Sequence, residues 1–333
     1  MTAFGTGYMI SNMRHEALGL GMQTDLLTIL GPQARVQAYV RSGGPVSDGN
    51  PELNNRLVRT LNEGLARCEA GRGDIVLVAF DHAENISTAD QMGSLVSGTR
   101  ILGMGTGSLR PTFTWTATAA TFLLDVANCS IENCRLLLAG PHAAGSALTV
   151  TAPITVSAAG CSIQNCEILF GYDADQIVTV GITTTAAATR FRFYNNYCYG
   201  ETAAACTTFL RLVGSDHLQI IGNTISGCTT AVAIGLVQFI TTDSLFAVIL
   251  NNRIHHALAA SESCVSVSAG ATSSSGFVDY LHLSTLANSA NQLVLGHANG
   301  AWGLSAAAFR FGRFINVGNL AGERAAEVTV VSA

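Results

Sequence analysis

Four cysteines stand in two pairs whose spacing would suit metal ligands. Cys129 and Cys134 lie within the stretch NCSIENCRLL, and Cys161 and Cys166 lie within the similar stretch GCSIQNCEIL. Four thiolates in tetrahedral geometry form a structural zinc site. Two equal pairs are also expected when one structural position recurs along a chain, so the surrounding sequence has to decide between the two interpretations.

The surrounding sequence contains a repeat that includes both pairs. Five segments align, and an apolar residue stands at positions one and three of each. Position five is Asn or Gly, and position six is Cys in the first two segments and Asn in the other three. The five segments are 129–136, 161–168, 191–198, 218–225 and 247–254.

The cysteines therefore occupy positions that other copies of the repeat fill with other residues. Cys129 and Cys161 replace Phe, Leu or Ala, and free Cys serves in such a core position as a small hydrophobe. Cys134 and Cys166 replace Asn, which suits a turn with positive φ and bonds to local backbone. A zinc site is not expected to draw its ligands from two such positions. We predict that all nine cysteines are reduced and bind no metal.

The repeat also predicts the fold. Alternating apolar residues, then Asn or Gly, then another apolar residue indicate a strand, a sharp turn and a second strand. A period of about 29 residues accommodates three short strands per coil of a parallel solenoid. Helical repeats are disfavoured because β-branched residues, Thr and Asn dominate the segments. We predict a parallel β-helix over 74–300, in which one interior column contains Ile131, Ile163, Phe193, Ile220 and Ile249.

The two ends of the chain do not follow the repeat. Residues 1–34 are predicted to form an N-terminal arm, and residues 301–333 further strands or a C-terminal arm. Residues 35–73 contain a strand, a loop and a helix. The open end of a solenoid has to be covered, and we assign this role to the helix.

The capping helix is predicted to span residues 51–70. Asn50 followed by Pro51 is typical of a helix start, with Asn as the cap and Pro in the first turn. One apolar stripe runs along the helix, formed by Leu53, Leu57, Leu61 and Leu65.

The composition constrains the partners. Charged residues make up 12% of the chain, against about 25% in an ordinary soluble domain, so we expect much of the surface to be buried against other copies or another protein. The net charge of -5 argues against nucleic acid as a partner, because such binding needs a basic surface. The longest apolar stretch, at 231–240, is too short to span a membrane. The N-terminus also lacks the pattern of a secretory signal.

Two groups of acidic residues are candidates for catalysis. Asp173 and Asp175 would share one face of an extended segment, and glycoside hydrolysis needs two carboxylates about 5–9 Å apart. The alternative is a solvated loop at a corner of the coil. Asp81, His82 and Glu84 could perform acid–base chemistry, but a turn after the first buried strand is the simpler interpretation.

Three further motifs are interpreted as structural. His255 and His256 lack a third metal ligand. Arg alternates with Phe at 190–193 and 309–314, which would suit stacking on nucleic acid, but a strand with Phe inward and Arg outward is favoured. We therefore predict no catalytic, cofactor-binding or metal-binding residues and no enzymatic activity.

The chain also resembles a known family. The stretches GDIVLVAFDHAENI and ILGMGTGSLRPT, followed by CSIENC and CSIQNC, resemble right-handed parallel β-helix proteins of tailed bacteriophages, especially virion proteins. The resemblance covers about residues 35–265 and is more specific for the family than for a role. It implies a capsid decoration or cement protein, a head spike or a tailspike, commonly a homotrimer.

Composition and resemblance together lead to one expected function. We expect a structural virion protein, made in the host cytoplasm, that decorates the capsid as a homotrimer by binding the major capsid protein. One alternative is a head or tail spike that binds or hydrolyses host surface polysaccharide. Another is a free polysaccharide lyase, which would need a secretion signal and basic catalytic residues in one groove.

Overall fold

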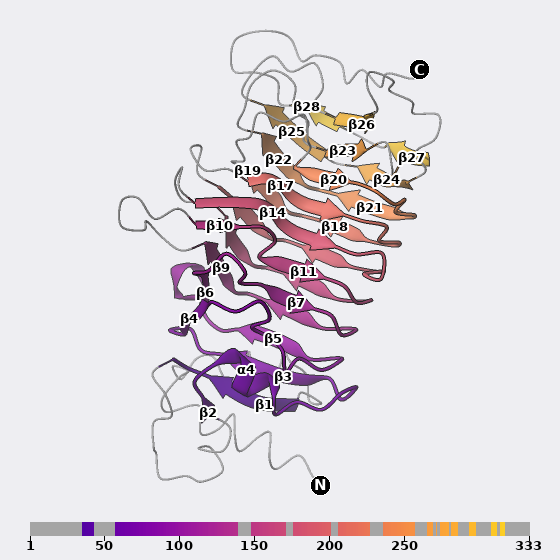
Figure 1. Cartoon of the computed structure of the whole chain (residues 1–333). Helices are drawn as coiled ribbons and strands as arrows, with labels where there is room; N and C mark the ends of the chain where they lie inside the picture. Colours follow the sequence, from indigo (N-terminus) through magenta and orange to yellow (C-terminus); the bar gives the residue numbers. More distant parts are fainter. Residues whose placement is uncertain are drawn as a thin grey trace.

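The computed structural model shows a parallel β-solenoid in which three sheets run along one axis (Figure 1). The structure describes residues 35–42, 57–138, 148–170, 176–200, 206–226, 236–256, 265–268, 271, 274–279, 281–285, 293–297, 308–311 and 314–316. In this part of the chain the three sheets contain eleven, nine and eight strands. We call them sheets A, B and C.

Each sheet gathers equivalent strands of successive coils. Sheet A contains, in order, β2 (Leu57–Val58), β1 (Arg35–Val40), β3 (Asp74–Val78), β5 (Arg100–Gly103), β8 (Ser130–Glu132), β12 (Ser162–Gln164), β15 (Arg192–Tyr194), β18 (Gln219–Ile221), β21 (Ala247–Leu250), β24 (Ser275–Asp279) and β27 (Ala308–Phe311). Sheet B contains β4 (Ala83–Ile86), β6 (Thr112–Trp115), β9 (Arg135–Leu138), β13 (Glu167–Leu169), β16 (Tyr197–Tyr199), β19 (Thr224–Ser226), β22 (Arg253–His256), β25 (Leu281–Thr285) and β28 (Phe314–Asn316). Sheet C contains β7 (Phe122–Leu124), β10 (Leu148–Val150), β11 (Ile154–Val156), β14 (Gln176–Thr184), β17 (Cys206–Leu212), β20 (Val237–Phe239), β23 (Val265–Ser268) and β26 (Leu293–His297).

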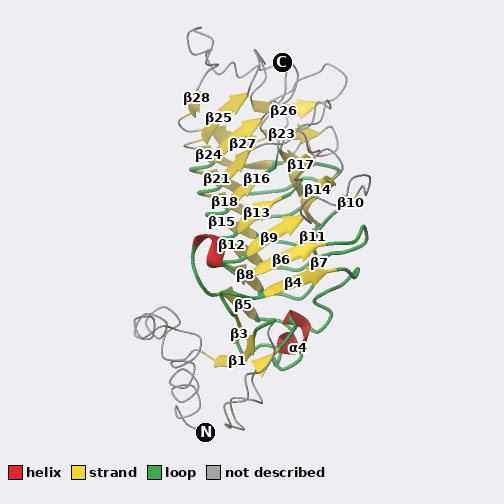
Figure 2. Cartoon of the chain, turned by 90° about the vertical axis from the view of Figure 1, so that its left-hand side faces the viewer, coloured by secondary structure: helices red, strands yellow, loops and turns green. Residues whose placement is uncertain are grey.

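The predicted interior column is confirmed. In sheet A, position three of each repeat pairs in register with position three of the next. All of these side chains are fully buried: Ile131, Ile163, Phe193, Ile220 and Ile249. Figure 2 shows the strands of successive coils stacked one above another along the axis. Because every coil buries its apolar side chains on equivalent residues of its neighbours, one continuous core forms along the solenoid.

The sharp turn between sheets A and B lies at position five of the repeat. Its residues adopt left-handed backbone geometry, with φ of 57° at Asn133, 55° at Asn165, 53° at Asn195, 71° at Gly222 and 53° at Asn251. Asn and Gly tolerate this conformation better than other residues. The positive φ that we assigned to position six therefore belongs to position five.

Position six instead points into the core and forms an asparagine ladder. Asn196, Asn223 and Asn252 are buried. The Oδ1 atom of Asn223 accepts from the backbone amide of Asn196 at 2.9 Å, and its Nδ2 donates to the carbonyl of Phe193 at 2.8 Å and to Oδ1 of Asn252 at 2.9 Å. Asn196 extends the ladder by accepting from the amide of Cys166 at 2.9 Å. Each side chain thus bonds the backbone of neighbouring coils rather than its own turn.

The capping helix is much shorter than predicted. Helix α4 spans Leu61–Leu65, and the Thr60 side chain caps it in a capping box with Glu63. Residues 51–56 lie outside the described part, and Leu57 belongs to strand β2, which pairs with β1. The predicted helix was too long because Leu57 fits the helical spacing of the leucines but lies in strand β2. Leu61 and Leu65 are fully buried in the core cluster, so the helix does cover the N-terminal end of the solenoid.

The sheets extend beyond the boundaries drawn from the sequence. Strand β1 pairs with β3, so sheet A begins before residue 74. Strands β27 and β28 pair with β24 and β25, so sheets A and B continue beyond residue 300. The predicted arm over 1–34 lies outside the described residues. Isolated strands at an end gain hydrogen bonds by joining an existing sheet edge, and this accounts for the longer solenoid.

The asparagine ladder predicts a large effect for one substitution. Asn223→Ala removes two donated and two accepted hydrogen bonds and leaves buried backbone groups unpaired. We expect it to lower the free energy of unfolding by about 2–4 kcal/mol, measured by urea denaturation. The neighbouring Thr224→Ala removes an outer, half-buried side chain and should change it by about 0.5 kcal/mol or less. Equal losses for the two variants would contradict the role of the ladder.

Candidate functional site

The first cysteine position lies in a buried column just before sheet A. Cys129 and Cys161 are buried. Their Sγ atoms contact the carbonyl oxygens of Val96 at 3.2 Å and Val126 at 3.3 Å, respectively. Phe191, which follows in the same position of the repeat, is also fully buried. The column is therefore a core position, as predicted.

The second cysteine position continues the asparagine ladder. Cys134 and Cys166 are fully buried, and their Sγ atoms contact the carbonyl oxygens of Glu132 at 3.3 Å and Gln164 at 3.4 Å. Within each pair the two sulfurs thus belong to different columns, one before and one after a sheet A strand. The described cysteines are all free thiols: Cys68, Cys129, Cys134, Cys161, Cys166, Cys198 and Cys206.

Burial keeps these thiols protonated. It raises the pKa of Cys129 to about 11 and that of Cys166 to about 12, and it raises the pKa of Cys134 well above its ordinary value. Zinc is bound by the thiolate form. Among the described residues, no three side chains of His, Cys, Asp or Glu come together in an arrangement that could hold a metal ion.

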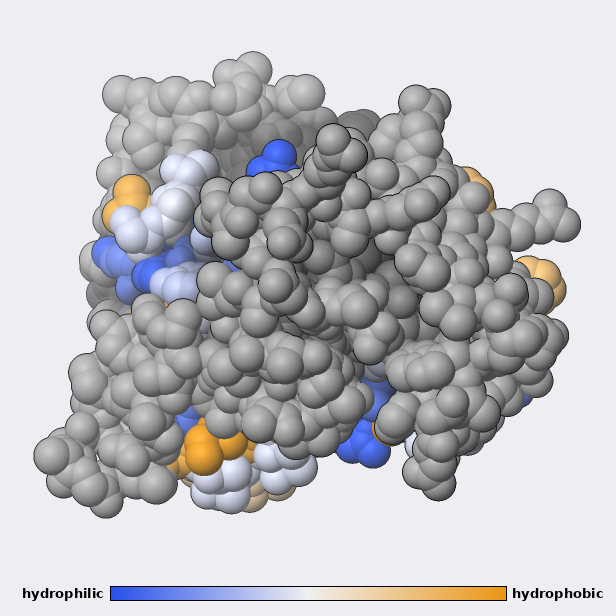
Figure 3. Space-filling model, turned by 90° about the horizontal axis from the view of Figure 1, so that it is seen from above, coloured by the Kyte–Doolittle hydropathy of each residue, from blue (hydrophilic) through white to orange (hydrophobic). Residues whose placement is uncertain are grey.

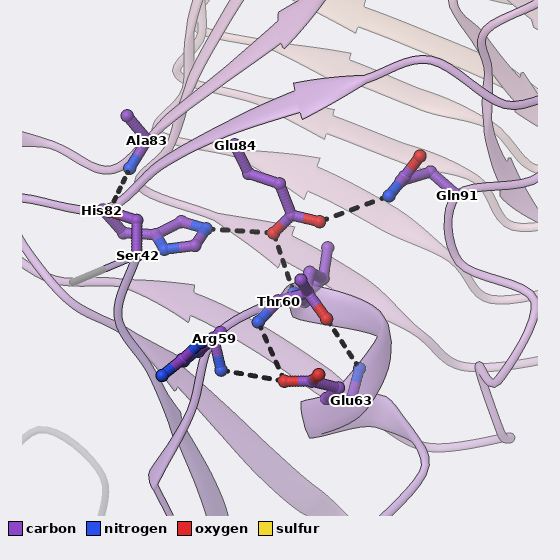
Figure 4. A network of polar contacts seen from close by, with 9 residues as sticks. Ser42, Arg59, Thr60, Glu63, His82, Ala83, Glu84 and Gln91 are labelled. Carbon is purple, nitrogen blue, oxygen red and sulfur yellow. Dashed lines mark hydrogen bonds and ion pairs between the residues drawn. The ribbon is translucent and has the colours of Figure 1, made fainter. Parts of the chain in front are cut away.

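The acid–base candidate His82–Glu84 anchors the cap (Figure 4). One oxygen of the Glu84 carboxylate accepts from the backbone amide of Leu61, the first residue of α4, at 2.8 Å, and lies 3.0 Å from Nε2 of His82. The other carboxylate oxygen of Glu84 accepts from the side-chain amide of Gln91 at 3.3 Å. Both His82 and Glu84 have nearly fully buried side chains. With these contacts the carboxylate stabilises the helix N-terminus, while Asp81 forms an ion pair with Arg41 at 2.9 Å.

The remaining predicted candidates do not form a site in the described part of the chain. Asp173 and Asp175 lie outside the described residues. His255 lies in β22 of sheet B, where it pairs in register with Ser226 of β19. Phe191 and Phe193 point into the core while Arg192 is exposed, so the predicted orientation of this motif is confirmed. In the second Arg–Phe motif, the strands β27 and β28 are described but their side chains are not.

The outer face of sheet A contains a polar cleft that was not predicted. Its volume is about 230 Å³, and it is lined by Arg100, Asn128, Cys129, Ser130, Glu132, Ser162, Gln164, Arg192 and Tyr194. These residues come from four neighbouring strands, β5, β8, β12 and β15, and from the corner that precedes β8. We call this site the sheet A cleft.

Glu132 is the central acid of the sheet A cleft. Nε and Nη2 of Arg100 donate to its two oxygens at 2.9 and 2.8 Å, and the Ser130 hydroxyl donates at 2.6 Å. Burial raises the pKa of the Glu132 carboxyl, but the hydrogen bonds from Arg100 and Ser130 outweigh burial and hold the pKa below its usual range. A general acid needs a raised pKa to hold its proton near neutral pH. Glu132 therefore does not fit that role.

A second unexpected feature is the corner that leads from sheet C to sheet A. One residue per coil has positive φ there: Gly98, Asn128, Gly160, Arg190, His217 and Phe246. The backbone amide of His217 donates to the carbonyl of Leu245 at 2.7 Å, and Leu245 is the residue before Phe246, the corner residue of the next coil. Each earlier corner residue likewise donates its amide to the carbonyl of the residue that precedes the next corner residue. The backbone geometry is therefore a property of the repeat, and the side chains are not determined by it.

The large residues of this corner form an exposed ridge. The rings of His217 and Phe246 stack with centroids 4.9 Å apart and planes 15° from parallel, and Phe246 is 61% exposed. A left-handed conformation costs a residue other than Gly or Asn about 1–2 kcal/mol. The corner residues that precede β5, β8 and β12 of the cleft are the small residues Gly98, Asn128 and Gly160, and a Cβ at Gly160 would lie 2.3 Å from Oδ1 of Asn128. The corner residues are large from Arg190, before β15, onward, and these form the ridge.

Positions two and four of the repeat carry the signal that would have located the cleft. Both face outward in sheet A and change from coil to coil. Position two is Ser130, Ser162, Arg192, Gln219 and Val248; position four is Glu132, Gln164, Tyr194, Ile221 and Leu250. The recurring positions of the repeat predict the core and give no information on this outer face.

Comparisons of the chain with protein-family models, with curated proteins and with solved structures find no match. In the described residues, no helix has both the length and the apolar character that a membrane crossing requires.

The buried cysteines predict low reactivity. Cys134 and Cys166 should resist alkylation by iodoacetamide at pH 8 in the folded protein, because access is blocked and the thiolate is scarce, and both should react in denaturant. Mass spectrometry of peptides measures this. As a control, Tyr197→Cys places a thiol at a position that is 51% exposed in the wild type and should react quickly. Rapid labelling of folded Cys134 would contradict the assignment.

The strain at Phe246 predicts an order of stability between two variants. Phe246→Asn and Phe246→Ala both remove the ring stacked on His217, but Asn tolerates positive φ better than Ala. We expect the Asn variant to be the more stable by about 1 kcal/mol, measured by thermal unfolding. An Ala variant at least as stable would show that the corner relaxes without cost.

Proposed function

We propose that this protein is a structural component of a bacteriophage virion. In this proposal it decorates the capsid as a homotrimer and stabilises the head by binding the major capsid protein. The fold is that of a parallel β-solenoid, and the bacteriophage context comes from the sequence resemblance over about residues 35–265.

The observation that carries this proposal is the exposure of large apolar side chains on the outside of the solenoid. They lie on strands, at a corner and in a short 3-10 helix (Gly107–Leu109) between β5 and β6: Leu109, Tyr197, Leu245, Phe246 and Phe277. In the view from above, hydrophobic surface of the described residues appears at several separate places around the outline (Figure 3). On a chain with few charges, neighbouring exposed apolar residues such as Leu245 and Phe246 favour contacts with other protein.

The bonding of the carboxylates supports a structural role over a catalytic one. Glu132 is paired with Arg100, Glu167 with Arg135 at 3.0 Å, and Glu84 with the start of α4. Carboxylates held in this way stabilise neighbouring coils or the cap. A hydrolytic pair would instead need one acid with a raised pKa close to an ionised partner.

The alternative is a spike that binds or hydrolyses host surface polysaccharide. The sheet A cleft favours it, because Tyr194, Gln164 and two arginines could contact sugar hydroxyls. Glu132 has no described acidic partner among the residues that line the cleft. This arrangement fits binding better than hydrolysis.

The proposed assembly predicts a mass. Light scattering of the purified protein should give about three times the chain mass of 34.6 kDa, because closed rotational symmetry buries the apolar lateral faces. Electron micrographs of virions labelled with an antibody to this chain should show label on the head.

Three results would count against the proposal. A stable monomer in solution would contradict the proposed trimer, and antibody label confined to the tail would favour a tail spike. Release of oligosaccharides from host surface polysaccharide by the purified protein would favour the hydrolytic form of the alternative. A Glu132→Gln variant would then test whether the sheet A cleft is responsible.

A further inference from the structure

The charges of the sheet A cleft do not cancel. Arg100 and Glu132 neutralise each other through two parallel hydrogen bonds. Arg192 has a hydrogen bond from Nη2 to the carbonyl oxygen of Gly160 at 3.3 Å, and no carboxylate of the described residues pairs with it. The cleft therefore presents one uncompensated guanidinium. A guanidinium binds a carboxylate through a planar pair of hydrogen bonds.

The size of the cleft limits what can occupy it. About 230 Å³ is below the range of roughly 300–1,000 Å³ that is usual for small-molecule sites. The cleft therefore has room for one or two side chains of a partner rather than for a large ligand. Around Arg192, the Ser162 hydroxyl and the side-chain amides of Asn128 and Gln164 line the same space. These groups supply further donors for a carboxylate.

The surface next to the cleft is apolar. Along sheet A, Tyr194 of β15 is followed in register by Ile221 and Leu250, before Asp279 ends this row, and Gln219 is followed by Val248 and Phe277. Phe277 is exposed and the other apolar residues of this strip are partly exposed. The ridge of His217 and Phe246 borders the strip at the corner.

A polar anchor beside an apolar strip has the chemistry of a protein interface. Such interfaces combine buried Arg and aromatic anchors with apolar contacts. In a chain of net charge -5, an arginine that no carboxylate of the described residues pairs with favours an acidic partner by charge complementarity. The strip gives that partner's neighbouring apolar residues a surface to cover.

We propose that sheet A binds an acidic segment of a partner polypeptide, with one Asp or Glu carboxylate on Arg192 in the cleft and apolar residues on the strip of Ile221, Leu250 and Phe277. This inference rests on the proposed attachment to another protein, for which it names the face and the chemistry. Peptide binding and virion attachment are measured separately, so either can fail without the other.

The test uses the purified full-length protein and two synthetic peptides, Gly-Leu-Asp-Phe-Gly and the same peptide with Asn in place of Asp, both with blocked ends. Calorimetry or NMR titration should show that the Asp peptide binds about tenfold or more tightly than the Asn peptide, which corresponds to about 1.4 kcal/mol. Arg192→Gln should abolish this difference. Arg253→Gln replaces another exposed strand arginine, on sheet B, and should leave it unchanged.

Four outcomes would overturn the inference. Equal binding of the two peptides, or an unchanged difference in Arg192→Gln, would show that the cleft does not recognise the carboxylate. Tighter binding of glucuronic acid or of inorganic phosphate than of the Asp peptide would indicate a sugar or phosphate site. Loss of the oligomer in Arg192→Gln, with the thermal stability unchanged, would identify a second copy of this chain as the occupant. In each case virion labelling still tests the proposed function independently.

Discussion

The stacking of equivalent residues along the solenoid axis is the constraint on which the rest of the structure depends. Each coil contributes a strand to every sheet, and an inward side chain has to fit the side chain one coil above and one coil below. In the asparagine ladder this fit includes hydrogen bonds, because Asn223 bonds Asn196, Asn252 and the carbonyl of Phe193 at once. A buried polar residue is stable only where all its partners are present. A substitution at one Asn of the ladder therefore removes hydrogen bonds in its own coil and in the coils on both sides.

The same constraint explains how much of the fold could be predicted. The apolar residues at position three recur because they stack, so their column could be identified from five aligned segments. Cys134 and Cys166 exchange with Asn for the same reason: the position accepts small groups that contact a backbone carbonyl. The turn was placed one residue too late because Asn stands at both positions five and six. Only the backbone distinguishes the Asn with positive φ, such as Asn195, from the buried Asn196.

The ends and the outer surface were harder to predict because stacking does not determine them. Leu57 continues the leucine stripe of the helix, yet pairing with Tyr39 in β1 places it in a strand. The cleft residues Arg100 and Glu132 lie 32 residues apart in the sequence, Glu132 and Arg192 lie 60 residues apart, and the three carry no common pattern. They meet because the register brings outward positions of successive coils to adjacent places. A candidate site of this kind can be read from a repeat only after its register is known.

Freedom on the outside and constraint on the inside together explain why the cleft is suited to binding. Ser130 and Glu132 flank the buried Ile131, whose neighbours in the column fix the strand in place. Binding groups held on such strands lose little conformational freedom when a partner arrives. The corner follows the same principle, since its hydrogen bonds hold positive φ at every coil and let one coil carry Gly160 and another Phe246. The strain at Phe246 is maintained by the coils around it, so a recognition surface can be built there without changing the core.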